Sequence, residues 1–154
     1  MKRALQATWA ILIWLFVIMI PIQFYLAGHG AMEGAHAADK SIPVMNTAWD
    51  PHVGFGSLML LVSLLALVVV LAARLPAPFI GVTTDLFAAM VFQFILPLLN
   101  DSASTRWIAA LHGVNALIVT GLAIGLAMRS RPYLPFVSGN VPAEEQTLAG
   151  TPSS

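Results

Sequence analysis

Four long apolar segments constrain the fold of this chain more than any other feature of its sequence. A helix of about 20 residues crosses the hydrocarbon core of a bilayer, and each segment is at least that long, at about 5–27, 49–73, 79–99 and 107–128. The chain is 58% hydrophobic and 9% charged, whereas about a quarter of the residues of a soluble domain are charged. The sequence therefore predicts an all-α integral membrane protein, a four-helix bundle in a lipid bilayer.

Basic residues flank these segments unevenly, and this predicts the orientation of the bundle. Lys40 and Arg106 fall on one side of the membrane, and the remaining cations fall on the other: Lys2, Arg3, Arg74, Arg129 and Arg131. By the positive-inside rule, both termini are expected in the cytoplasm. The bundle itself is expected in a bacterial cytoplasmic membrane. The tryptophans Trp9, Trp49 and Trp107 are expected at the interfaces.

The segments predict one membrane domain, residues 1–131, followed by a Pro/Ser/Gly-rich tail, residues 132–154, that is expected to be disordered. A polar, glycine-containing outer loop is expected over 28–48, and a tight hairpin over 75–78. The first segment is expected to be a retained helix, because its apolar run is too long for a signal peptide.

Two alternatives describe the start of the second helix. Asp50 followed by Pro51 is typical of an N-cap and first helical residue, whereas a capping box from Thr47 would start the helix three residues earlier. The fourth helix can be capped by Ser104 or Thr105.

A short internal repeat relates the two halves of the chain. The stretch PIQFYLA at 21–27 resembles VFQFILP at 91–97, with Gln23 and Gln93 in register, and each precedes a histidine-led helix that ends in arginine. Two parallel helical hairpins related by an axis along the membrane normal would place His52 and His112 at similar depth. Measured from the nearest tryptophans, the two depths differ by about 3 Å.

Composition excludes several functional classes. The chain has no cysteine, so disulfides, iron–sulfur clusters and covalent haem attachment are excluded. Its net charge is zero, which gives no basic surface for nucleic acid. No motif of a hydrolase, phosphate-binding loop or zinc protease is present, so the sequence leaves open whether the protein is an enzyme.

His52 and His112 are the strongest candidate site. Ionisable side chains inside a membrane are rare and mark functional sites, and facing helices of a bundle commonly hold haem through histidine. The pair predicts a noncovalent haem b with both histidines as axial ligands to the iron. The alternative is that both are interfacial polar residues bonded to water or loop carbonyls.

Several neighbours suit such a site. Asn115, one turn from His112, can bond a haem edge or a helix backbone, and Asp50 can accept a hydrogen bond that orients an imidazole. Small residues leave room for the macrocycle: Gly54, Gly56, Gly113 and Ala116.

Other polar residues inside the segments have simpler explanations. Gln23 and Gln93 are expected to form interhelical hydrogen bonds. Asp85 is expected to pair with Arg74 or Arg129 or to bond the adjacent threonines, with a proton-handling role as the alternative.

Two further patterns are weaker. His29, Glu33 and His36 have the spacing of one helix face and can bind Zn²⁺ or Cu²⁺ if that stretch is helical, but its glycines favour a solvated loop. Gly121 and Gly125 form a small-xxx-small face that is expected to pack against another helix.

Two resemblances follow from these residues. The topology, with His52 and His112 at the outer ends of the second and fourth helices and Asp50 near the first, resembles one half of haem A synthase and implies haem binding. The sequences QFYLAG from Gln23, DPH from Asp50 and LHGVNAL from Leu111 resemble a group of uncharacterised bacterial four-helix membrane proteins. That second resemblance implies no established activity.

The sequence thus predicts a small cytochrome-b-like protein for electron transfer or a redox accessory role. The alternative is a cofactor-free scaffold or accessory subunit with membrane protein partners or further copies of itself. A third interpretation is a transporter that uses Asp85 as a proton site.

Overall fold

The computed structural model describes residues 1–36, 42–99 and 106–136. It contains four long helices: α1 (Lys2–His36), α2 (Ile42–Ala72), α3 (Ala77–Leu98) and α4 (Arg106–Ser130), followed by the short 3-10 helix η2 (Arg131–Tyr133). Each long helix holds a stretch apolar and long enough to cross a membrane. The protein is therefore an all-α, multi-pass membrane protein, as the sequence predicts.

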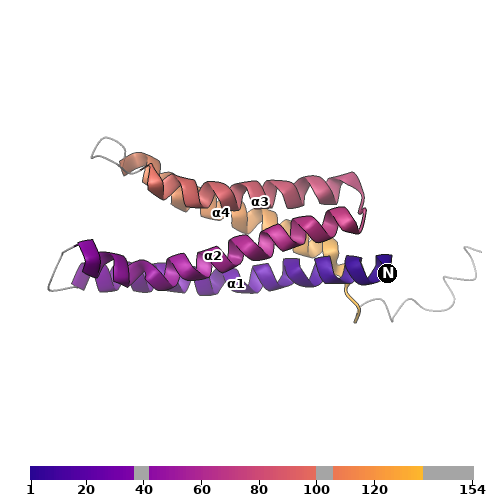
Figure 1. Cartoon of the computed structure of the whole chain (residues 1–154), viewed down its shortest axis with the longest axis horizontal. Coiled ribbons are helices and arrows are strands. Elements are labelled where there is room, and N and C mark those ends of the chain that lie inside the picture. The colour runs from indigo at the N-terminus through magenta and orange to yellow at the C-terminus, as the bar shows by residue number, and fades with distance from the viewer. Residues whose placement is uncertain (37–41, 100–105, 137–154) are drawn as a thin grey trace, which may run out of the picture.

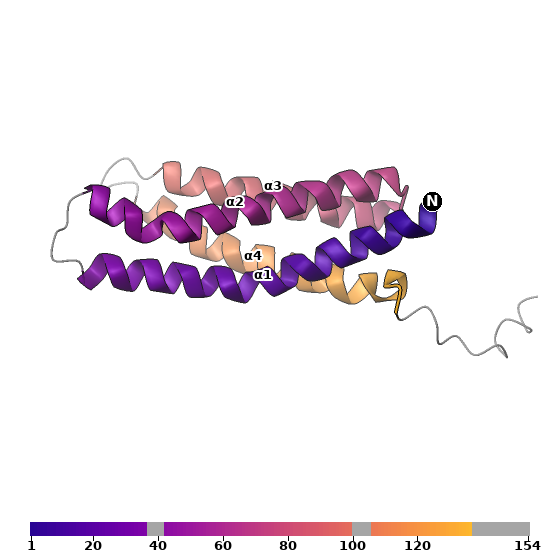
Figure 2. The same ribbon diagram turned by 60° about the horizontal axis from the view of Figure 1, so that its bottom comes forward.

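The helices pair as two hairpins, α1 with α2 and α3 with α4 (Figure 1). The start of α1 and the end of α4 lie at the same end of the bundle (Figure 2), which we call the terminal end; the opposite end is the loop end. The two hairpins lie close together near the terminal end and separate toward the loop end (Figure 1).

The close-packed core fills the terminal half of the bundle. Trp9 lies at its centre, fully buried, with its indole Nε1 donating to Thr83 Oγ1 at 3.3 Å. The rings of Phe79 and Tyr133 meet the Trp9 ring edge to face, at centroid distances of 5.4 and 5.9 Å. Trp9 lies near the start of α1, and its ring joins α1, α3 and η2 inside the protein rather than facing the surface.

The hairpin between α2 and α3 is tight, as predicted. Arg74 adopts a left-handed φ of 50°, the Arg74 N–H donates to Leu71 O at 3.1 Å, and the Leu75 N–H donates to Val70 O at 3.4 Å. These two bonds define a Schellman motif, and the buried side chains of Val70 and Leu75 supply its hydrophobic contact.

The predicted loop over 28–48 is wrong in its extent. α1 continues to His36 and α2 already begins at Ile42, so both helices run beyond the apolar stretches that define them. Pro51 lies inside α2, and both proposed starts of that helix are therefore wrong. Close contact between the two helices explains the extension: a Cβ at Gly30 would lie 2.9 Å from Ala48 O, so glycine permits the approach.

The proposed caps Ser104 and Thr105, Lys40, and all of the tail after Phe136 lie outside the described residues. The first residues of the predicted tail are ordered, because η2 follows α4 directly and Leu134 is buried against the core.

Candidate functional site

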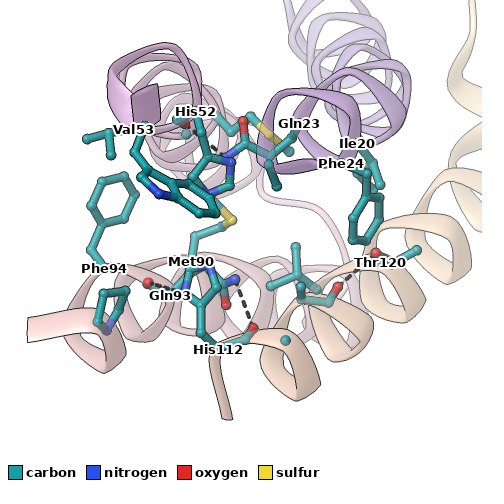
Figure 3. Close-up of a pocket in the computed structure, with 18 of the residues that line it drawn as sticks. Ile20, Gln23, Phe24, His52, Val53, Met90, Gln93, Phe94, His112 and Thr120 are labelled. Carbon is teal, nitrogen blue, oxygen red and sulfur yellow. Dashed lines mark hydrogen bonds between the residues drawn. The ribbon is translucent and has the colours of Figure 1, made fainter. Parts of the chain in front are cut away.

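A cavity of about 800 Å³ lies between the two hairpins in the loop half of the bundle. This volume falls within the usual range for ligand sites, about 300–1,000 Å³. His52 and His112 both line it, from α2 and α4 (Figure 3). Their ring centroids are 6.1 Å apart with an interplanar angle of 64°, so the fold brings together the two histidines that the sequence singled out.

The cavity wall repeats the pattern of the two hairpins. Each α1 residue that lines it has an α3 counterpart at one constant sequence offset: Ile20 with Met90, Gln23 with Gln93, Phe24 with Phe94, and Ala27 with Pro97. The α2 and α4 residues match in the same way: His52 with His112, Val53 with Gly113, Gly56 with Ala116, and Met59 with Val119. The internal repeat predicted from the glutamines therefore extends to most of the cavity wall; Trp49, Leu98 and Thr120 line it without such a counterpart.

In the second hairpin, Gln93 and His112 bind each other through two hydrogen bonds. The Gln93 side chain donates from Nε2 to the His112 backbone carbonyl at 3.0 Å. The His112 Nδ1 lies 3.0 Å from the Gln93 backbone carbonyl. Because a carbonyl only accepts, this bond requires the proton on Nδ1 and leaves Nε2 with its lone pair.

The first hairpin repeats this arrangement in looser form. Gln23 Nε2 donates to the His52 backbone carbonyl at 3.1 Å. His52 Nδ1 is buried without a hydrogen-bond partner in the described parts of the chain, and so is Gln23 Oε1. The prediction that both glutamines bond neighbouring helices is confirmed, and the bonds join them to the histidine-bearing segments.

Asn115 strengthens the second hairpin only. It is buried, and its amide donates to Ala89 O at 2.8 Å and to Gln93 Oε1. Asn115 therefore bonds the helix backbone, which is one of its two predicted roles. Its second bond holds the Gln93 side chain in place through Oε1. The matching position of α2 is Phe55, which carries no polar group, and this explains why Gln23 Oε1 has no partner.

Most of the small residues that were predicted to leave room for a macrocycle line the cavity, but one does not. Gly113 and Ala116 line the cavity, whereas Gly54 faces open space. Gly56 lines the cavity, and a Cβ there would lie 3.0 Å from Gln23 Nε2. Its lack of a side chain thus makes room for the glutamine as well as for a ligand.

Asp50 does not have its predicted role. It is exposed and does not line the cavity, and the described residues show no hydrogen bond from it to either imidazole. The Gln93 main-chain carbonyl takes this place at His112, whereas His52 Nδ1 has no hydrogen-bond partner among the residues described. Trp49 packs beside His52 with ring centroids 5.6 Å apart.

Asp85 also differs from expectation. It is exposed on α3, and within the described ranges the ion pair seen is His29 with Glu33, so its pairing with arginine is wrong. The adjacent Thr83 and Thr84 hydroxyls donate to carbonyls of their own helix instead.

The stretch of α1 that carries His29, Glu33 and His36 is helical, but these three side chains do not form a metal site. His29 Nε2 lies 3.9 Å from Glu33 Oε1, and His36 Nδ1 bonds Met32 O. No group of three or more such ligands occurs among the described residues. A Cβ at Gly121 or Gly125 would meet no atom within 4 Å among the described residues, so neither glycine is in close contact with another helix there.

The fold and cavity define a helical membrane protein with one ligand-sized cavity between two repeated hairpins. The chain belongs to a family of unknown function, DUF6220, which matches residues 23–99, half of the chain. The matched region runs from Gln23 to the end of α3, so it includes His52 and Gln93. No curated protein and no solved structure matches the chain. The resemblance to haem A synthase stays a prediction.

Proposed function

We propose that this protein is a small cytochrome-b-like membrane protein that binds one haem b, with His52 and His112 as axial ligands to the iron. The separation of the two imidazoles is the observation that carries the proposal. With metal–nitrogen bonds of about 2 Å, as for imidazole on zinc, two imidazoles on opposite sides of one ion have ring centroids about 6 Å apart. The observed separation is 6.1 Å.

The hydrogen bonds around the ligands favour this function. Histidine ligands characteristically donate their other ring N–H to a carbonyl or carboxylate, which fixes the tautomer and the ring orientation. His112 does so through the Gln93 carbonyl. His52 stands in the matching position on α2, although its Nδ1 is without a hydrogen-bond partner within the described ranges.

The cavity suits a macrocycle in volume and chemistry. Its wall is mostly apolar, as haem requires, and aromatic side chains from both hairpins, Phe24 and Phe94, lie on it. Two histidine ligands leave no open position on the iron, and this favours electron transfer over oxygen chemistry. The excess of cations at the terminal end supports cytoplasmic termini and a bacterial inner membrane.

The experiment is an absorption spectrum of the full chain, purified in detergent after expression with added haem, first oxidised and then reduced with dithionite. We expect sharp reduced α and Soret bands at about one haem per chain. His52→Ala and His112→Ala should lose or shift these bands. The other two histidines, His29 and His36, provide matched controls, and their alanine variants should leave the spectrum unchanged.

Substitution with another ligand covers the case in which an alanine variant does not fold. His112→Met retains a possible iron ligand, so the spectrum should shift while haem remains bound. A folded, colourless wild-type protein from haem-supplemented cells would refute the proposal. The cofactor-free scaffold would then be the leading function, tested by partners or further copies that purify with the chain.

A further inference from the structure

A second hollow lies in the terminal half of the bundle, on the outer surface of α1 and away from the histidines. It encloses about 750 Å³ and is a groove with a mostly apolar wall. α1 forms one side, and the chain after α4 forms the other. The residues that line the groove are Ile11, Trp14, Leu15, Ile18, Arg131, Leu134 and Phe136. Arg131 is the charged member of this set.

Arg131 has no anionic partner among the described residues. Its guanidinium carbon lies 5.9 Å from the centre of the Trp14 ring, and the ion pair seen within the described ranges is the distant His29 with Glu33. The side chain is exposed. A guanidinium presents several donors in a planar fork, which matches the geometry of a phosphate group.

The apolar side of the groove extends from this cation into the membrane. Ile11, Leu15 and Ile18 follow the helical repeat on one face of α1 and are 47%, 43% and 60% exposed. From Ile11 to Ile18 the helix rises about 10 Å. A charged group beside an apolar stripe of this length is complementary to a phospholipid, with its phosphate at one end and its acyl chain along the stripe.

The cations near the groove favour an anionic lipid over a zwitterionic one. Lys2, Arg3, Arg74 and Arg129 lie toward the same end of the bundle, and the described ranges show none of them in an ion pair. Clustered cations next to a membrane attract anionic lipids. We propose that this groove binds one anionic phospholipid, with its phosphate on Arg131 and an acyl chain against Leu15 and Ile18.

Native mass spectrometry of the full chain in detergent tests this site. The protein is titrated with dioleoylphosphatidylglycerol and, separately, with dioleoylphosphatidylcholine, and the fraction carrying one lipid is measured. The wild type should bind the phosphatidylglycerol more tightly. Arg131→Gln should weaken its binding about fivefold, the effect of one cation near a lipid surface. Arg129→Gln is the matched control, since it removes a cation at the same end of the bundle that does not line the groove, and it should lose less affinity than Arg131→Gln.

Two further measurements separate the alternatives. Arg131→Lys keeps the charge with fewer donors, so it should lose less affinity than Arg131→Gln. Excess inorganic phosphate should not displace the lipid, because the apolar wall contributes to binding. Equal affinities in Arg131→Gln and Arg129→Gln, equal wild-type affinity for the two lipids, or displacement by phosphate would overturn the proposal.

Discussion

Gln23 and Gln93 occupy matching positions in the two hairpins, yet their loss should have unequal effects on stability. Methionine is the substitution of choice, because it keeps the volume of the side chain and removes its hydrogen bonds. Gln23→Met removes one side-chain bond, to the His52 carbonyl, since Gln23 Oε1 has no partner. A side-chain hydrogen bond between membrane helices contributes about 0.6 kcal/mol on average. We therefore expect Gln23→Met to lower the free energy of unfolding by about 0.6 kcal/mol.

Gln93→Met removes two side-chain bonds, one to the His112 carbonyl and one from the Asn115 amide. The buried Asn115 amide would keep its bond to Ala89 O and lose the other. We expect a loss of about 1–2 kcal/mol, two to three times that of Gln23→Met.

Reversible unfolding in mixed detergent micelles, followed by circular dichroism, measures both variants without haem. The double variant Asn115→Leu/Gln93→Met tests whether the two side chains are coupled. Because the two residues share one hydrogen bond, the double variant should lose less free energy of unfolding than the two single variants added together. Equal losses for Gln23→Met and Gln93→Met, or a larger loss for Gln23→Met, would refute the asymmetry that we derive from Asn115.

Two further predictions concern the backbone. Arg74→Gly should raise the free energy of unfolding by about 1 kcal/mol, because glycine adopts the left-handed φ of 50° without the strain of a Cβ; Arg74→Ala, which keeps the Cβ and removes the charged remainder of the side chain, should show no gain, and a gain in both would assign the effect to loss of the arginine side chain. Gly121→Ala and Gly125→Ala should also stabilise by about 1 kcal/mol each, since a Cβ meets open space there. Gly56→Ala should raise the free energy of unfolding by less than the other two variants, or lower it, because its Cβ would lie 3.0 Å from Gln23 Nε2. Equal gains in all three variants in the same unfolding assay would contradict this prediction.

Much of the architecture could be predicted from the sequence because the bilayer limits what an apolar chain can form. A segment in hydrocarbon must satisfy every backbone N–H and carbonyl internally, so four long apolar segments form four helices. The loop-end extensions of α1 and α2 could not be predicted, because glycines such as Gly30 lower helix propensity. In the folded hairpin, Gly30 instead permits close contact with Ala48 and Trp49.

The sequence by itself determined that His52 and His112 lie at matched positions of two helices, because helical rise fixes their depth and the glutamine repeat fixes their register. Only the tertiary structure decided that the two rings lie 6.1 Å apart on one cavity. The same holds for the Gln93 main-chain carbonyl that bonds the His112 imidazole in place of a carboxylate. Depth follows from local geometry, whereas the rotation of each helix about its axis follows from packing with its neighbours. That packing is tight in the terminal half and open at the histidines.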